Sequence, residues 1–101
     1  MAFEFYKRSA NQRFIDAQYK LGCCYDHGIG VDINIEKAFK LYKIAAEGGN
    51  SSAQKSLASL YEQGKGTEKN IDSAFHWYSK AFENGRHEIK ECLENLNHLL
   101  K

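Results

Sequence analysis

Small and apolar residues recur along most of the chain at the three- and four-residue spacing of a helix with one buried face. They stand at positions 17, 21, 24, 25 and 28 of one stretch, and at 35, 38, 39, 41, 42, 45 and 46 of the next. Charged residues fill positions 36, 37, 40 and 43 between them. This period predicts amphipathic helices over about 17–27 and 35–47. Extended along the chain, the pattern predicts six helices and no strand.

Glycine and asparagine mark the ends of these helices. Gly28 and Gly30 follow the first helix, and Gly49 follows the second. Glycine adopts the positive φ that commonly ends a helix, so we expect breaks at these positions. Asn34 and Asn70 precede helical stretches, where an asparagine side chain accepts a hydrogen bond from a free backbone amide. We therefore predict that both residues are helix N-caps.

The stretch 17–49 occurs again as residues 53–85, aligned without a gap at an offset of 36 residues, since 53 − 17 = 36. A fixed period of this length is the signature of a repeat array, in which each helix pair buries its apolar face against its neighbours. The identical pairs include Ala17/Ala53, Gln18/Gln54, Leu21/Leu57, Tyr25/Tyr61, Gly28/Gly64, Gly30/Gly66, Asn34/Asn70, Ala38/Ala74, Phe39/Phe75, Tyr42/Tyr78, Ala45/Ala81 and Gly49/Gly85.

The same offset also shows which part of a repeat each end of the chain corresponds to. We expect residues 1–101 to form a single repeat domain. An Ala-Phe-x-x-Tyr signature begins at residues 2, 38 and 74. Residues 1–13 are therefore expected to be the second helix of a partial repeat, ending in a polar break at about 11–13. Two full repeats follow at 14–49 and 50–85. Residues 86–101 have one polar face, as a C-terminal capping helix should.

These residues resemble the Sel-1-like repeat family, a relative of the tetratricopeptide repeat. The first repeat matches the family pattern at Ala17, Leu21, Gly22, Tyr25, Gly28, Gly30, Val31, Lys37, Ala38, Tyr42, Ala45, Ala46 and Gly49. The second matches at Ala53, Leu57, Tyr61, Gly64, Gly66, Ala74, Trp77, Tyr78, Ala81 and Gly85. Departures from the pattern are Asn34, Asn70, Thr67 and Leu41. The resemblance implies an all-α, right-handed α-solenoid of antiparallel helix pairs that serves as a scaffold for protein–protein interaction.

Net charge, the length of apolar runs and the number of cysteines indicate the class of partner and the cellular compartment. The formal net charge is +1, which gives no basic excess for nucleic acid or an anionic membrane. No apolar run approaches the roughly 20 residues of a membrane span, so no membrane insertion is expected. Three cysteines, two of them adjacent, make a poor disulfide framework and suit a reducing compartment. We therefore expect a cytoplasmic protein whose partner is another protein.

The repeat supplies an internal control for motifs that suggest chemistry. Cys23-Cys24-x-x-His27 suggests a metal site, yet Cys24 aligns with Leu60, which makes it a core position. A structural zinc site usually has four converging protein ligands, and one helix does not supply them. The Gly-x-Gly pairs follow helices, whereas phosphate loops follow strands. We expect no catalytic residue, no metal and no cofactor, and no enzyme activity in this chain.

The face opposite Leu21 is the candidate binding surface, by analogy with the concave face of tetratricopeptide arrays. It is predicted to carry Asp16, Tyr19, Cys23, Asp26, Lys55, Ser59, Glu62, Glu88, Glu91 and Asn95. Five acids against one base indicate a basic, extended or helical partner segment, with Tyr19 as an aromatic anchor. The alternative is a merely solvated helix face, because exposed charges are common on helices.

Two functions stay open at this point. One is a non-catalytic protein–protein interaction scaffold or adaptor. The other is a regulatory or docking tail of a larger signalling protein, for example a kinase-like one. Phe3, Phe5, Tyr6 and Phe14 also give the N-terminal helix a heavy aromatic load, which indicates self-association or docking through that end.

Overall fold

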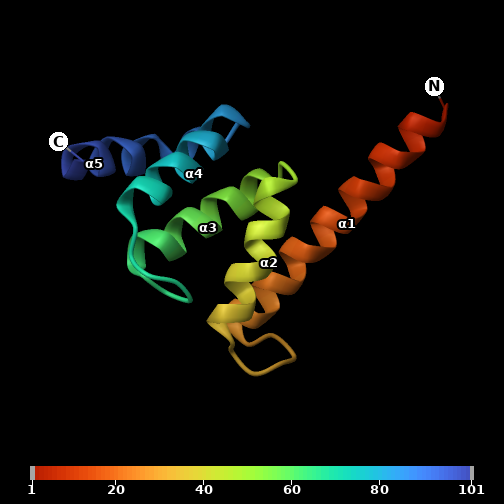
Figure 1. The fold of residues 1–101 in the computed structure, drawn as a ribbon, viewed down its shortest axis with the longest axis horizontal. Coiled ribbons are helices and arrows are strands. Elements are labelled where there is room, and N and C mark those ends of the chain that lie inside the picture. Colours follow the sequence, from red (N-terminus) through yellow and green to blue (C-terminus); the bar gives the residue numbers. More distant parts are fainter. Residues whose placement is uncertain (1, 101) are drawn as a thin grey trace.

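Five α-helices and one 3₁₀ turn make up the computed structural model, which describes residues 2–100 and the side chains from Gln12 onward (Figure 1). The helices run in the order α1 (Ala2–His27), α2 (Ile35–Glu47), α3 (Ser51–Gln63), α4 (Ile71–Glu83), the 3₁₀ turn η1 (His87–Ile89) and α5 (Lys90–Leu100). Residues 2–100 contain no strand. The predicted all-α helical-repeat fold is confirmed, with five helices in place of the six expected.

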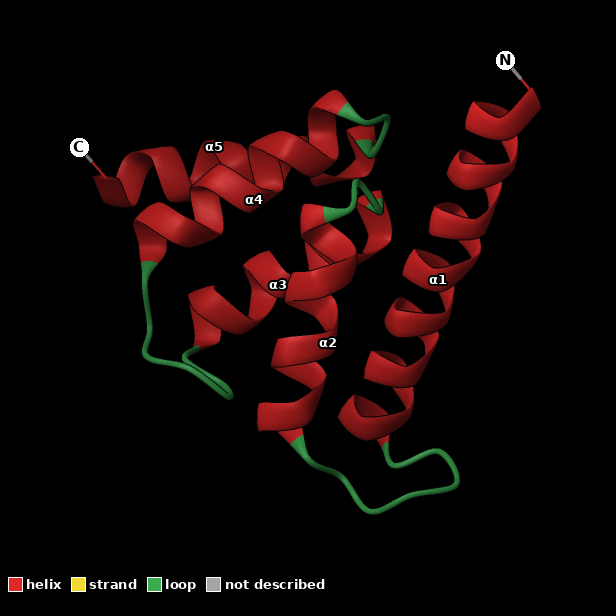
Figure 2. Cartoon of the chain, turned by 45° about the vertical axis from the view of Figure 1, so that its right-hand side comes forward, coloured by secondary structure: helices red, strands yellow, loops and turns green. Residues whose placement is uncertain are grey.

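Each helix packs against the next along the chain: α1 against α2, α2 against α3, α3 against α4, and α4 against α5. Figure 2 shows the resulting succession of helix pairs, with short loops joining neighbours. The molecule measures 48 × 35 × 20 Å. This stepwise packing is the arrangement that a solenoid of stacked repeats requires, since each repeat contacts only the repeats next to it.

Asparagine side chains cap three of the helices. The Asn34 carboxamide oxygen accepts from the Lys37 amide at 3.1 Å, and Asn70 makes the equivalent bond at the start of α4. Both predicted N-caps are confirmed. Asn50 also caps α3, where its carboxamide oxygen accepts from the Ala53 amide at 2.8 Å. The sequence pattern did not single out Asn50, because its counterpart one repeat later is Arg86.

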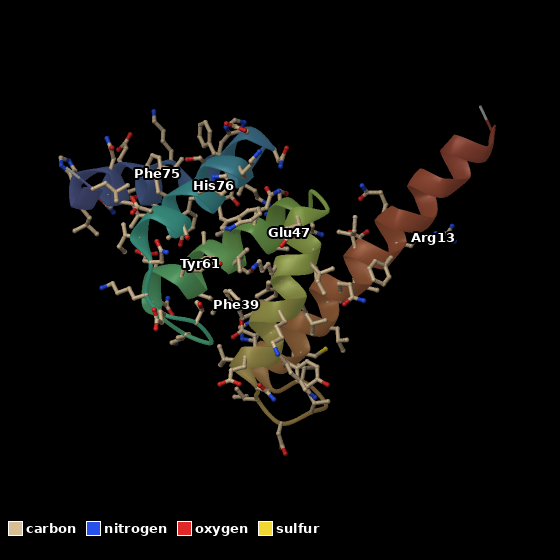
Figure 3. The ribbon with its side chains drawn as sticks, viewed as in Figure 1. Arg13, Phe39, Glu47, Tyr61, Phe75 and His76 are labelled. Atoms are coloured by element: carbon tan, nitrogen blue, oxygen red, sulfur yellow. The ribbon has the colours of Figure 1, made fainter. Side chains whose placement is uncertain are left out.

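The core consists of two clusters joined by aromatic contacts. One lies between α1, α2 and α3 and contains Ala38, Tyr42, Ala45, Ala46, Ala53, Leu57 and Leu60. The other lies between α3, α4 and α5 and contains Ala58, Ala74, Tyr78, Ala81, Ile89 and Leu96. Phe39 and Tyr61 meet edge to face with their ring centroids 5.3 Å apart, where α2 faces α3 (Figure 3). Such an offset geometry stabilises aromatic pairs beyond their burial.

Small residues let the helices approach closely. Gly22 is buried against α2, and a Cβ there would lie 2.8 Å from the Tyr42 ring. The absence of a side chain at Gly22 therefore lets α1 and α2 approach closely. Gln54, the counterpart of Gln18, is buried and bridges three helices. Its amide nitrogen donates to the Ala46 carbonyl at 3.1 Å, and its carbonyl accepts from Asn84 at 2.9 Å.

The predicted break at residues 11–13 is wrong, because α1 runs without interruption from Ala2 to His27. The reason lies in the turn residues. Gly49 and Gly85 adopt φ of +97° and +98° at the turns between repeats, and the residue aligned with them is Arg13, since 49 − 36 = 13. A side chain disfavours that conformation, so the helix continues. Arg13 therefore stands in mid-helix, and the N-terminal half of α1 extends away from the other helices (Figures 1 and 3).

The continuous helix leaves part of the first repeat uncovered. Leu57 is fully buried beneath α2, whereas its identical counterpart Leu21 is 43% exposed. Ala53 is buried and Ala17 is exposed in the same way. The prediction of a buried Ala17–Leu21 stripe is therefore wrong for this repeat, because no helix of residues 2–100 covers α1 in the way that α2 covers α3.

A groove between α1 and α3

An open groove of about 460 Å³ lies between the first helices of the two repeats, α1 and α3. Its surface is mostly polar and includes hydroxyl, amide and charged side chains. The lining residues are Tyr19, Asp26 and His27 of α1; Ser52, Lys55, Ser56, Ser59, Leu60 and Gln63 of α3; and Lys65, Tyr78 and Arg86 beyond them. The groove therefore lies on the surface where the concave face was expected.

Two buried tyrosines direct their hydroxyl groups toward acids of the first helices. The Tyr42 hydroxyl donates to Asp26 at 2.9 Å, and the Tyr78 hydroxyl donates to Glu62 at 3.0 Å. Burial, reinforced by the neighbouring carboxylate, raises the pKa of both tyrosines well above the ordinary value. Both phenols thus stay protonated at neutral pH, and each carboxylate acts as the hydrogen-bond acceptor. The pair recurs at the offset of 36 residues, which makes it part of the repeat architecture.

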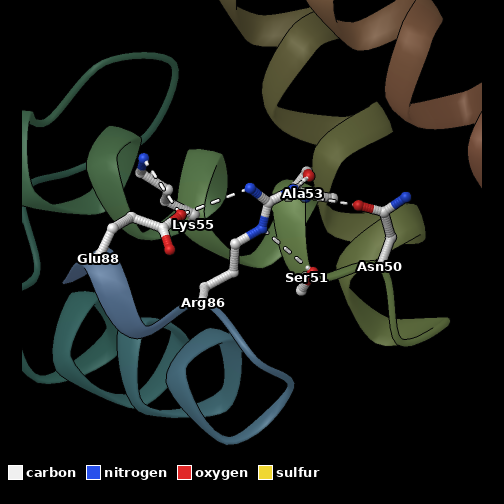
Figure 4. Close-up of polar contacts among 7 residues, drawn as sticks. Asn50, Ser51, Ala53, Lys55, Arg86 and Glu88 are labelled. Atoms are coloured by element: carbon white, nitrogen blue, oxygen red, sulfur yellow. Dashed lines mark hydrogen bonds and ion pairs between the residues drawn. The ribbon is translucent and has the colours of Figure 1, made fainter. Parts of the chain in front are cut away.

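Arg86 connects the loop before η1 to the start of α3 (Figure 4). Its Nε donates to the Ser51 hydroxyl at 3.3 Å, and its guanidinium also donates to the Ser52 hydroxyl. Glu88 accepts from Arg86 at 3.4 Å and lies 3.9 Å from the Lys55 Nζ. The pKa of Glu88 is lowered by its own backbone amide and then by Arg86 and Lys55. These contacts fix the end of the groove and keep Glu88 ionised.

Comparison with known proteins identifies the repeat. The sequence model described as Sel1 repeat matches residues 1–14, 15–50 and 51–85, which together cover most of the chain. The chain belongs to the Sel1 repeat family. Proteins built from Sel1 repeats generally act as scaffolds for protein–protein interaction. A search of curated proteins finds no match to this chain.

Solved structures of Sel1 repeat proteins share the fold. A Sel1 repeat protein from Oxalobacter formigenes is 34% identical, with a TM-score of 0.78 over 89% of this chain and 37% of its own. The protein c5321, a protective antigen of uropathogenic Escherichia coli with an SLR fold, is 34% identical, with a TM-score of 0.71 over 84% of this chain and 18% of its own. The chain thus spans well under half the length of either protein. Neither match supports a tail of a kinase-like protein.

Four of the residues predicted for the binding face of this Sel1 repeat chain line the groove, namely Tyr19, Asp26, Lys55 and Ser59. Glu62 and Glu88 do not line it themselves, but each contacts a residue that does, Tyr78 and Lys55 respectively. The remaining four do not line the groove. Asp16 accepts from Asn50 at 3.2 Å, Cys23 packs against the core cluster of α1, α2 and α3, and Glu91 and Asn95 are exposed on α5.

Placing Cys23 on an open surface is wrong, for a physical reason. The helical wheel assigns faces relative to Leu21, which is itself exposed in this repeat. The side of α1 that packs against α2 therefore carries Gly22 and Cys23, and Leu21 lies outside it. Cys23, Cys24 and Cys92 are half-buried free thiols. Among residues 2–100, no group of three or more histidine, cysteine or acidic side chains is arranged to hold a metal ion.

Sequence reasoning missed three kinds of groove residue. Ser56 aligns with Lys20, so the repeat gave no signal for it. Tyr78 was interpreted as a core residue, which is correct for its ring, but its hydroxyl reaches the groove. Arg86 was predicted to be the first residue of the C-terminal capping helix, 86–101. Its replacement of Asn50, the N-cap residue one repeat earlier, is the signal that marks it as different.

The added residues change the charge of the site. The sequence count set Asp16, Asp26, Glu62, Glu88 and Glu91 against one base, an excess of four acids. Of these acids only Asp26 lines the groove, whereas Lys55, Lys65 and Arg86 all line it. With Glu62 and Glu88, which contact lining residues, three acids face three bases. The acidic excess predicted from the sequence is therefore not found in the groove. No helix within residues 2–100 is both long enough and apolar enough to span a membrane.

Proposed function

We propose that this chain is a non-catalytic interaction module that binds a segment of a partner protein in the groove between α1 and α3. The observation that carries the proposal is the groove itself, which is open and lined from two successive repeats. Ser52, Ser56 and Ser59 follow one face of α3 along it, and hydroxyl groups both donate and accept hydrogen bonds. Tyr19 adds the kind of aromatic side chain that is enriched at binding hot spots.

The partner segment in this proposal carries a basic residue. The carboxylates of Asp26 and Glu62 each accept one tyrosine hydroxyl, yet an ionised carboxylate offers about four acceptor positions. Both acids are part-buried, which strengthens their attraction to a cation relative to bulk water. Glu88 engages Lys55 and Arg86, which leaves Asp26 and Glu62 as acids facing the single base Lys65.

A bulky side chain in the groove tests the proposal. Ser59→Trp adds bulk at a groove-lining residue of α3 that takes no part in either tyrosine–carboxylate bond. We expect at least a tenfold loss of the partner captured from cell extract, since a displaced contact at a hot spot costs about 2 kcal/mol. Capture is quantified by mass spectrometry against the unmodified chain, and circular dichroism checks that each variant is folded.

Ser79→Trp is the matched control, because it adds the same bulk on α4 outside the groove. Its counterpart one repeat earlier is the exposed Lys43, so the position accommodates a long side chain. The control is expected to retain the partner. Equal loss from both variants, or retention by both, would place the contact elsewhere. Retained partner should elute as salt is raised, because screening weakens a charged contact.

A further inference from the structure

One strip of α1 is apolar and uncovered, although two of its three positions are core in the next repeat. Phe14 is 55% exposed and Leu21 is 43% exposed, with Ala17 exposed between them. We call Phe14, Ala17 and Leu21 the α1 strip. One repeat later, Ala53 and Leu57 have no exposed surface. The alanine and the leucine are thus buried in one repeat and open to water in the other, while Phe14 aligns with the N-cap Asn50.

The equivalent residues of the next repeat show which helix normally covers this strip. On α3, the cover is α2, the second helix of the preceding repeat, which carries the Ala-Phe-x-x-Tyr signature as Ala38, Phe39 and Tyr42. The same signature begins at residue 2, within the N-terminal half of α1. The family match also assigns residues 1–14 to a Sel1 repeat. The chain therefore carries the covering sequence, but in the N-terminal half of α1 itself, and α1 is one continuous helix (Figure 2).

The turn that would fold this segment back is missing. The turn before α3 reads Gly48-Gly49-Asn50, with Gly49 at φ +97° and Asn50 as N-cap. Residues 12–14 read Gln-Arg-Phe at the aligned positions. They supply neither the turn glycine nor the N-cap, so α1 stays continuous. Residues 2–10 therefore do not fold back to cover the α1 strip of the same chain.

We propose that two copies of this chain exchange their N-terminal segments, so that residues 2–10 of each copy cover the α1 strip of the other. The two α1 helices would run antiparallel, as successive helices of the array do, and the two-fold axis would pass near Arg13. Each copy gives and receives the same contact, which makes the interface self-complementary and closed. Exchange of an element across an open hinge is a low-cost route to a dimer.

The mass of the 101-residue chain in solution tests this pairing. Sedimentation equilibrium at about 100 μM is expected to give twice the 11.5 kDa of one chain. Leu21→Lys places a charge in the covered strip and should halve that mass. Ile44→Lys is the control, since Ile44 is 47% exposed on α2 and its counterpart is already Lys80. The control should stay dimeric.

A turn variant separates exchange from any other use of the strip. Gln12→Gly and Arg13→Gly together give residues 12 and 13 the Gly-Gly sequence of 48 and 49 and leave Phe14 of the α1 strip unchanged. We expect this variant to fold back on its own strip and to become monomeric with its helical circular dichroism retained. Persistence of the dimer in this variant would overturn the exchange, as would a monomeric unmodified chain or a Leu21→Lys variant that stays dimeric.

The dimer is independent of the groove. Ser59→Trp alters the groove on α3 and is expected to leave the mass of the dimer unchanged. Partner capture therefore tests the groove and solution mass tests the dimer, and either proposal can fail without the other.

Discussion

Replacing Leu57 with alanine is expected to lower the free energy of unfolding by about 3 kcal/mol. The Leu57 side chain has no exposed surface and lies in the cluster between α1, α2 and α3. Loss of a buried leucine costs about 2–5 kcal/mol, because the transfer energy is lost and a cavity remains. Urea unfolding followed by circular dichroism measures the change, with the midpoint and the slope fitted separately.

Leu21→Ala is the matched substitution at the same position of the preceding repeat. Because Leu21 is 43% exposed in the single chain, we expect a loss below about 1 kcal/mol. Both variants are compared at about 1 μM, where dilution favours the monomer over any association. An equal loss from the two would show that Leu21 is covered within its own chain, contrary to the structure.

Replacing Gly66 with alanine is expected to be as damaging as a core truncation, at about 3 kcal/mol. Gly66 has φ of +72°, which costs a residue with a side chain about 1–2 kcal/mol. A Cβ there would also lie 2.8 Å from the carbonyl oxygen of Ile35, a backbone atom at the start of α2. Backbone cannot move aside as a flexible side chain can, so the loop between α3 and α4 must shift away from α2.

Gly30→Ala separates the two causes. Gly30 is the counterpart of Gly66, with nearly the same φ of +74°, but nothing lies within 4 Å of its Cβ position. Only the conformational cost of about 1–2 kcal/mol is expected there. Thermal and urea unfolding of the two variants give the difference. Equal losses would mean that the contact of the Gly66 loop with Ile35 does not contribute to stability.

The period of the sequence predicted most of the fold, because equivalent positions of the two repeats can be compared within one sequence. Helix ends were predictable where glycine and asparagine recur, as at Gly28 and Gly64 or Asn34 and Asn70. These residues act locally, through φ and through a side-chain bond to a nearby amide. The same local chemistry explains the error at the N-terminus. Alignment of the Ala-Phe-x-x-Tyr signature suggested a turn at 11–13, while the residues aligned with the turn glycines lack the required conformational freedom.

The site was predicted less well because it depends on contacts between elements. A helical wheel shows which residues share a face, and it placed Tyr19, Asp26, Lys55 and Ser59 together correctly. It does not show which face its neighbour covers, so Cys23 was placed at the surface. Residues that reach the groove from another element, above all Arg86, leave no periodic signal. The bond between Tyr42 and Asp26 is likewise absent from any local pattern, since 16 residues separate its partners.

Those tyrosine–carboxylate bonds also determine which substitutions are informative. Charge reversal at Asp26 or Glu62 would break a bond to a buried phenol, so a lost partner could reflect a damaged core. A buried hydroxyl left without its acceptor costs about 1–3 kcal/mol. Filling the groove at Ser59 avoids this ambiguity.

Chemical crosslinking of the captured partner through lysines tests the central claim most directly. Lys55 and Lys65 line the groove, whereas Lys40 and Lys43 are exposed on α2 and lie outside it. Mass spectrometry of the crosslinked peptides identifies which lysines lie next to the partner. The groove account predicts crosslinks at Lys55 and Lys65. Crosslinks confined to Lys40 and Lys43 would contradict it and assign the partner to the outer helices.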